Sequence, residues 1–208
     1  QIMPRIGPNP AITTERADFD VVKLPNGETR MYVGVGGGGV CNPATGDCDI
    51  FARFRRNDNV RSAPAGLVAA NWIDLTNPTL DTPGFSSFGY CDPQCSYDNY
   101  VFAPAGHFPN SGANADVVYL SGANRYPENN WGPASPFCCP DNPNTGRSNG
   151  RGVAVSTDAG ATFTDMTEDT SDDRYPVGLH PDHHALVVNP LNWRQFFDVG
   201  DGGIARSN

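Results

Sequence analysis

The sequence contains little charge and no long apolar run. Charged residues make up 18% of its 208 residues, and the formal net charge is -9. No stripe of basic residues is present that could neutralise phosphates, which argues against a nucleic-acid partner. No apolar stretch is long enough to span a membrane. Amphipathic helical spacing is also missing from every window longer than about a dozen residues.

Glycine and proline are abundant, with 23 and 19 copies respectively. Together with the missing helical period, this composition predicts an all-β chain with long irregular connections. The strand-like segments follow one another in a repeated order. We expect an extended lead-in and three strand units, at residues 1–17, 18–96, 97–182 and 183–208.

Each of the first two units contains four expected strands. In the first unit these are residues 18–24, 29–35, 49–56 and 71–75, followed by an inserted loop. In the second they are residues 97–103, 116–121, 152–155 and 162–166. The third unit has strands only at residues 184–189, 194–200 and 203–207, and is therefore expected to be incomplete.

Six cysteines lie in loops rich in Gly, Pro and Asn, as three close pairs: Cys41 with Cys48, Cys91 with Cys95, and Cys138 with Cys139. An even number favours disulfides, and hence a secreted or cell-surface location. A metal site is the alternative, but Cys-x2-Cys knuckles are missing and no histidine is close in sequence. The first pair could close a local loop. For the other four cysteines we expect two cross-links between the loop at 91–95 and the loop at 138–139.

A short strand, a tight polar turn and a second strand lie in residues 152–166. Ser156, Asp158 and Gly160 supply the polar side chains and the positive-φ position that a sharp reversal needs. Phe163 can then fold back over the turn. This Ser-x-Asp-x-Gly-x-x-Phe pattern resembles the Asp box of BNR-repeat β-propellers, which include sialidases, sortilin-like receptors and xyloglucanase-like glycoside hydrolases. The resemblance implies an architectural role for these residues, between the third and fourth strands of a blade.

A second segment is similar to the same propellers, in the runs HPDHHAL from His180, Asn189-Pro190, GDGGI from Gly200, and Arg206-Ser207. The likeness covers residues 116–208, whereas residues 1–115 match only in strand order. It implies a β-propeller segment built of four-stranded antiparallel blades with long disulfide-stapled loops. Closed propellers use at least about four blades. We therefore expect other blades of a larger propeller, or other subunits, to complete the ring.

Three histidines flank one carboxylate in the run His180, Asp182, His183 and His184. Imidazoles and a carboxylate in one loop can converge on Zn²⁺, so His180, Asp182 and His183 are candidate metal ligands. If His183 and His184 begin a strand, however, they point to opposite faces of the sheet. The alternatives are that Asp182 or His183 lines a central channel, or that these side chains bond to neighbouring loops.

Asp201 lies in an Asp-Gly-Gly turn and is a further channel candidate. Its simplest role is to accept hydrogen bonds from turn amides. Asp198 and Asp201 flank Gly200 and could also act as paired carboxylates or calcium ligands. Calcium is the one candidate cofactor, because the loops are rich in Asp and Asn, although no EF-hand spacing is present.

Three functions remain open on these grounds. A binding module for glycan or protein would use the aromatic residues in or beside the inserted loops: Tyr90, Tyr97, Tyr100, Tyr126, Trp131 and Phe137. A structural subunit would have neighbouring chains complete its sheets. A glycoside hydrolase, sialidase-like or xyloglucanase-like, would need catalytic carboxylates mostly outside this segment, because no acidic pair stands out within it. We favour binding or structure over catalysis.

Overall fold

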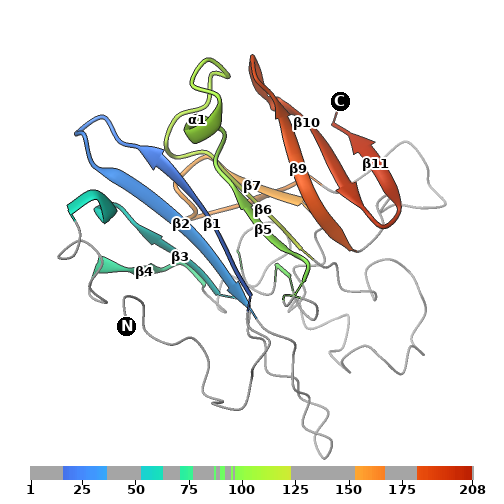
Figure 1. Ribbon diagram of the computed structural model, residues 1–208, viewed down its shortest axis with the longest axis horizontal. Helices are drawn as coiled ribbons and strands as arrows, with labels where there is room; N and C mark the ends of the chain where they lie inside the picture. The colour runs from blue at the N-terminus through green and yellow to red at the C-terminus, as the bar shows by residue number, and fades with distance from the viewer. Residues whose placement is uncertain are drawn as a thin grey trace, which may run out of the picture.

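The computed structural model describes residues 16–36, 53–62, 71–76, 87, 90–91, 95, 97–122, 153–166 and 182–207. These residues form three antiparallel sheets, one short α-helix and one turn of 3-10 helix at Val60–Ser62 (Figure 1). The all-β prediction is therefore confirmed. No helix in the described ranges has the length and apolar character needed to cross a lipid bilayer.

The first sheet contains four strands in chain order: β1 (Arg16–Lys23), β2 (Thr29–Gly36), β3 (Arg53–Asn57) and β4 (Ile73–Asp74). The predicted Pro-Asn-Gly turn joins β1 to β2. Gly27 takes a φ of +87°, and the Asn26 side chain accepts a hydrogen bond of 3.0 Å from the Glu28 N–H. Side chains on β1 alternate, so that Asp20 and Val22 are buried while their neighbours are exposed.

The second sheet also follows chain order: β5 (Asn99–Phe102), β6 (Val118–Gly122), β7 (Val153–Ser156) and β8 (Thr164–Asp165). A single helical turn, α1 (Pro104–His107), follows β5. Its proline is at the first turn, where the missing N–H costs nothing. All residues of β6 and β7 are buried, because this sheet is covered on both faces.

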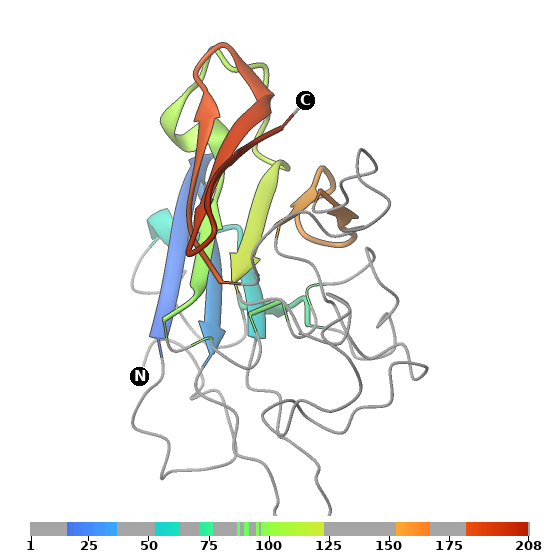
Figure 2. The ribbon, with the colours of Figure 1, turned by 90° about the vertical axis from the view of Figure 1, so that its right-hand side faces the viewer.

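The third sheet has the order β11-β10-β9, from β9 (His183–Asn189), β10 (Asn192–Gly200) and β11 (Gly203–Arg206). Its strands lie at the segments expected from the sequence, and no fourth strand joins them within residues 182–207. When the molecule is turned by 90°, this sheet lies in front of the other two (Figure 2).

Two apolar clusters hold the three sheets together. Between the first and second sheets, Tyr32 stacks on Phe54 at 5.9 Å, and Phe54 meets Phe163 edge-on at 5.8 Å. Between the second and third sheets, Tyr119 meets Phe196 edge-on at 5.4 Å. Val188 is buried in the same second cluster. Face-to-face packing of apolar side chains therefore sets the order of the stack.

Polar side chains also cross from the first sheet to the second. The Arg30 guanidinium bonds Asp58 and Asp116, each at 2.5 Å, and donates to the Ala115 carbonyl at 2.9 Å. Burial alone would lower the pKa of Arg30, but the bonds to the two carboxylates outweigh burial and raise it. The buried guanidinium therefore stays charged and links the two sheets.

Carboxylates on β1 cover the free edge of β5. Asp18 accepts a hydrogen bond of 2.7 Å from the Val101 N–H, and Asp20 accepts one of 2.7 Å from the Ala103 N–H. These two amides point away from β6, so they would otherwise remain unpaired within the fold. Side chains of the first sheet thereby accept the hydrogen bonds of free backbone N–H groups on the edge strand of the second sheet.

The turn between β7 and β8 contains the Asp-box pattern. Ser156 Oγ accepts hydrogen bonds from the N–H groups of Asp158 at 3.3 Å and Gly160 at 2.8 Å. The Asp158 carboxylate accepts from the N–H and the hydroxyl of Thr162, at 2.8 and 2.5 Å. Burial tends to raise the pKa of Asp158, but these hydrogen bonds prevail and lower it. Phe163 is buried behind the turn.

Cys91 and Cys95 form a disulfide with each other. The prediction that both cross-link to the loop at 138–139 is therefore wrong. The Cα atoms of Cys91 and Cys95 are 4.7 Å apart, within the span that a disulfide bridges, so this short loop closes on itself. The other cysteine candidates, Cys41, Cys48, Cys138 and Cys139, lie outside the described residues.

We expect Gly160→Ala to destabilise the protein more than Gly27→Ala. Both glycines have nearly the same φ, +85° and +87°, so both variants pay about 1–2 kcal/mol for a left-handed residue. A Cβ at Gly160 would lie 2.6 Å from Phe54 Cε1, whereas at Gly27 the nearest atom is 3.8 Å away. Crowding should therefore cost Gly160→Ala a further 1–3 kcal/mol or so.

Urea unfolding of the two variants and the wild type measures this difference. Gly27→Ala is the matched control, since it changes the same residue type at the same backbone angle. Equal losses of unfolding free energy in the two variants would contradict tight packing of Phe54 against the turn.

Candidate functional site

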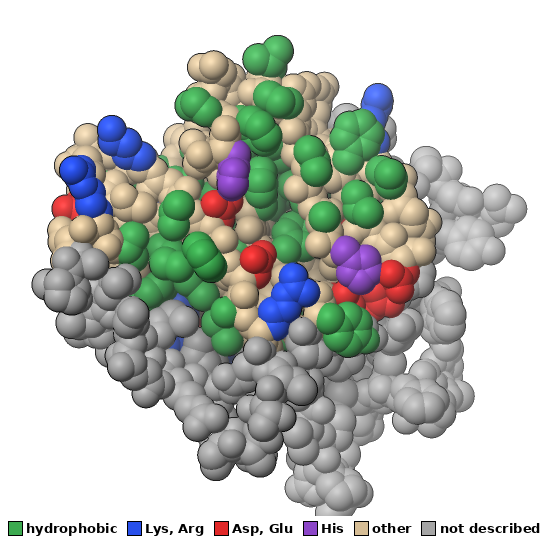
Figure 3. All heavy atoms as spheres, viewed as in Figure 1, with side chains coloured by type: hydrophobic (Ala, Val, Ile, Leu, Met, Phe, Trp, Pro, Cys, Tyr) green, Lys and Arg blue, Asp and Glu red, His purple; other side chains and the backbone are tan. Residues whose placement is uncertain are grey.

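The first strands of the three sheets, β1, β5 and β9, begin at the same end of the molecule, toward the bottom of Figure 1. There the Arg16 guanidinium donates a hydrogen bond to the Tyr97 carbonyl, which joins the start of β1 to the segment before β5. Figure 3 shows basic, acidic and histidine side chains close together on this part of the surface. We treat this end as the candidate site.

His184 is at the centre of the site and links two sheets. Its Nδ1 atom lies 3.0 Å from Asp98 Oδ1, and its Nε2 atom lies 2.6 Å from Asp201 Oδ1. Asp98 precedes β5 in the second sheet, whereas Asp201 lies in the turn between β10 and β11 in the third. The imidazole is half-exposed, and it is hydrogen-bonded through Nε2 to Asp201, while Nδ1 only lies near Asp98.

Asp98 is a buried carboxyl group with a raised pKa. Burial raises the pKa of Asp98 to about 6, and the negative charge of Asp182 adds to this rise, while His184 opposes it. Asp98 is completely buried and Asp182 nearly so. The Asp98 carboxyl group therefore holds its proton more tightly than an isolated aspartate.

His184 is biased toward its charged form. The hydrogen bond to Asp201 raises the pKa of His184, and the charges of Asp98 and Asp182 act in the same direction. The cluster therefore combines a histidine whose pKa is raised, an exposed carboxylate at Asp201 and a buried carboxyl group at Asp98.

A second histidine contact is buried beneath the surface cluster. His183 Nδ1 lies 2.6 Å from Asp198 Oδ2, and the Tyr100 hydroxyl donates to Asp198 Oδ1 at 3.4 Å. Burial raises the pKa of Tyr100, and the charge of Asp198 adds to that rise. All three side chains are buried. This network connects β5 to β9 and β10, but it is closed to solvent.

The predicted site residues separate into these two networks. His183 and His184 point to opposite faces of the sheet, as expected for neighbours on a strand. Asp198 and Asp201 also lie in different networks. Asp198 pairs with His183, whereas Asp201 pairs with His184. Asp182 joins the surface cluster through Asp98. The paired-carboxylate interpretation of Asp198 and Asp201 is therefore wrong.

No group of three or more metal-ligating side chains converges within the part of the chain that the structure describes. His183 is committed to Asp198, and His184 is held between Asp98 and Asp201. The candidate ligand His180 lies outside the described residues. The zinc and calcium hypotheses thus gain no support from these side chains.

Sequence reasoning missed two residues of the site, Asp98 and Arg16. Asp98 precedes a strand inside a cysteine-containing loop, and nothing in its local pattern indicates a partner 86 residues later. Arg16 begins β1, where its charge looks like an ordinary exposed strand position. Both acquire their roles only because β1, β5 and β9 meet at one end.

No protein family, curated protein or solved structure matches this chain.

We expect Asp98→Asn to change the pH dependence of stability. The pKa of Asp98 is about 6 in the folded protein against 3.8 for an unperturbed aspartate, so the folded state binds more protons between these values. The wild type should lose stability as pH rises through this window, by up to about 3 kcal/mol. The variant cannot titrate and should not share this loss.

Urea unfolding between about pH 4 and 7.5 gives the stability difference between wild type and variant at each pH. That difference should shift in favour of the variant as pH rises. Asp74→Asn, at a carboxylate that is partly exposed in an ion pair elsewhere, is the control and should not reproduce the slope. A constant difference between wild type and Asp98→Asn would rule out the raised pKa.

Proposed function

We propose that this chain is a segment of a β-propeller that works as a secreted or cell-surface binding module, and that it takes a glycan at the end where β1, β5 and β9 begin. The observation that carries the proposal is an exposed tyrosine that is adjacent in sequence to a residue of the polar cluster. Tyr97 exposes 53% of its surface and directly precedes Asp98. Its carbonyl is held by Arg16.

The propeller interpretation draws on the way the sheets are built. Two sheets each have four antiparallel strands in chain order, and a third has three. Successive sheets pack face to face, and their first strands lie side by side, with β1 against β5 and β5 against β9. This is the arrangement that blades adopt around a central channel.

Glycan binding suits the chemistry of this end. An exposed tyrosine ring can cover the apolar face of a sugar while its hydroxyl remains in water. Asp201 and His184, both substantially exposed, offer a hydrogen-bond acceptor and donor to sugar hydroxyls. Because His184 is already hydrogen-bonded to Asp201, less conformational entropy of its side chain is lost when a ligand binds.

A secreted location agrees with the disulfide between Cys91 and Cys95. Disulfides persist in oxidising compartments and are rare in the cytosol. The bond closes a loop next to the site, since Tyr97 and Asp98 follow Cys95 within three residues. The disulfide therefore restricts the backbone conformations of the segment that carries the exposed Tyr97 ring.

Glycoside hydrolysis is the less favoured alternative. Hydrolases of this type place their two carboxyl groups roughly 5–9 Å apart, with the sugar and often a water between them. Asp98 is completely buried and Asp182 nearly so. Carboxyl groups that are closed to solvent are poorly placed to meet a glycosidic oxygen, so the arrangement favours binding over cleavage.

We expect Tyr97→Ala to weaken glycan binding about tenfold or more, because loss of the ring removes both stacking and buried area. The measurement is affinity electrophoresis of the intact, oxidised chain through gels that contain single soluble polysaccharides, including xyloglucan, β-glucans and sialylated glycans. Leu191→Ala is the matched control, because Leu191 is an exposed apolar residue at the β9–β10 turn.

Retardation of the wild type and of Leu191→Ala, but not of Tyr97→Ala, would support the site. Equal retardation of all three proteins would place binding elsewhere. If no polysaccharide retards the wild type, the glycan proposal fails and a protein ligand becomes the better explanation.

A further inference from the structure

The third sheet differs from the other two in having three strands, rather than four, among the described residues. Its edge strand β11 pairs with β10 on one side, and no described strand pairs with its other side. Most of β11 is exposed to solvent, and Ile204 exposes 73% of its surface. An exposed strand edge with an apolar side chain is a place where a further strand can add to a sheet.

The fourth strands of the first and second sheets share one type of sequence. Strand β4 lies in the run Trp72-Ile73-Asp74-Leu75, and strand β8 lies in the run Phe163-Thr164-Asp165-Met166. Each run consists of an aromatic residue, a β-branched residue, an aspartate and a long apolar residue. The pattern occurs at no other place in the 208 residues. The chain therefore uses one kind of tetrapeptide to complete both four-stranded sheets.

Both tetrapeptides pair with the third strand of their sheet in the same register. The Leu75 N–H donates to the Phe54 carbonyl of β3 at 3.0 Å, and the Met166 N–H donates to the Val153 carbonyl of β7 at 2.9 Å. In both sheets, the β-branched residue lies opposite the third-strand residue two positions further along the chain. The two sheets thus provide a template for how a fourth strand binds.

Strand β11 offers the acceptor that this template requires. The Ser207 N–H donates to the Phe196 carbonyl at 2.9 Å, so the backbone of Ser207 faces β10. Because backbone groups alternate along an antiparallel strand, the N–H and C=O groups of Ile204 and Arg206 point away from β10. Ile204 precedes the serine at the end of its strand by three positions, as Val153 does on β7. The outward carbonyl of Ile204 therefore corresponds to the carbonyl that Met166 binds in the second sheet.

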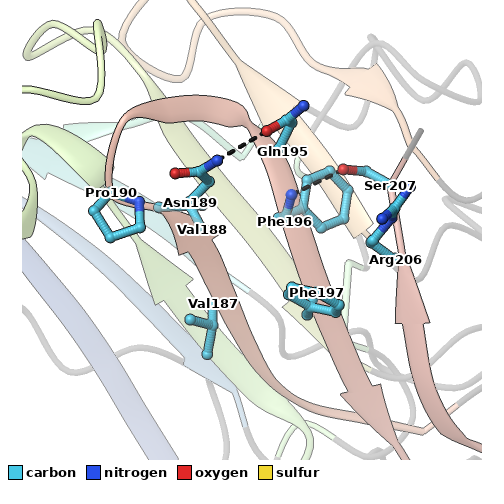
Figure 4. A pocket seen from close by; sticks show the side chains of 9 residues that line it. All are labelled: Val187, Val188, Asn189, Pro190, Gln195, Phe196, Phe197, Arg206 and Ser207. Atoms are coloured by element: carbon cyan, nitrogen blue, oxygen red, sulfur yellow. Dashed lines mark hydrogen bonds between the residues drawn. The ribbon is translucent and has the colours of Figure 1, made fainter.

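A groove of about 470 Å³ adjoins this edge of the third sheet (Figure 4). It is lined by Arg206 and Ser207 at the end of β11 and by Phe196 and Phe197 of β10. A strand in the template register would place its β-branched residue opposite Arg206 and its aromatic residue opposite Ser207. Both side chains would lie beside the groove, and the long apolar residue would lie beside Ile204.

We propose that β11 binds an extended segment of a partner protein, which adds antiparallel as the fourth strand of the third sheet. The segment contains an aromatic residue, a β-branched residue, an aspartate and a long apolar residue in succession. A partner supplies it because the two tetrapeptides of this type within the 208 residues already form β4 and β8. The inference rests on the shared construction of the three sheets and not on glycan binding.

Amide hydrogen exchange, measured by NMR on the full oxidised chain, tests the proposal. The probe is a synthetic peptide with the sequence ATFTDMTE, which is that of residues 161–168. At millimolar concentration the peptide should slow exchange of the Arg206 N–H about threefold or more, because this amide would then donate to the peptide backbone. The Ala205 N–H already faces β10 and should change less.

Variants of the peptide and of the protein test the register. A peptide with Met166→Pro lacks the N–H that would donate to the Ile204 carbonyl, and it should give no protection. In the protein, Ile204→Ala should weaken peptide binding about fivefold, because an apolar contact is lost. Leu191→Ala is the matched control, since Leu191 is similarly exposed, at 77%, in the β9–β10 turn.

Three results would overturn the proposal. Exchange at Arg206 that stays unchanged at millimolar peptide would show that the edge does not accept this segment. Equal protection by the proline peptide would show that the backbone register is wrong. Protection of the Arg206 amide in the protein alone would show that the chain itself, or a second copy of it, already covers the edge.

Two cross-checks separate this proposal from glycan binding. Tyr97→Ala should bind the peptide as the wild type does, because Tyr97 precedes β5 and does not belong to the third sheet. Ile204→Ala should be retarded by polysaccharide as the wild type is. A wild type that is retarded by polysaccharide but gives no response to the peptide would overturn strand addition alone. The reverse result would overturn glycan binding alone.

Discussion

Burial of the second sheet between the other two is the constraint on which the rest of the structure depends. Its strands are apolar on both faces, so it cannot be stable with either face in water. On one face of the second sheet, Phe163 packs against Phe54 of the first sheet. On the other face, Tyr119 packs against Phe196 of the third sheet.

Polar contacts between sheets accompany this packing and add directionality to it. Apolar faces alone would allow neighbouring sheets to slide, since dispersion and hydrophobic burial are weakly directional. Arg30 bonds two carboxylates across the first contact, and Asp18 and Asp20 bond backbone amides of β5. At the second contact, the Tyr100 hydroxyl donates to Asp198, and His184 lies 3.0 Å from Asp98. Hydrogen-bond geometry therefore sets the register between sheets.

The site and the fold are linked because the same histidine serves both. His184 joins the second sheet to the third and also exposes its imidazole at the surface. The raised pKa of Asp98, about 6, makes this junction sensitive to acidity. A ligand bound there would touch two sheets at once, and ligand binding and sheet packing are expected to influence each other.

Local chemistry was enough to predict the strands and the turns. Alternation of apolar side chains placed all three strand sets, Pro-Asn-Gly indicated the first hairpin, and Ser156 with Asp158 indicated the turn after β7, because each signal depends on a few adjacent residues. Partners could not be predicted in this way. Asp98 meets His184, and Cys91 meets Cys95 rather than the loop at 138–139, because those choices depend on which strand ends and loops the packed sheets bring together. Periodicity specifies the face on which a side chain lies, whereas packing of the sheets specifies what it touches.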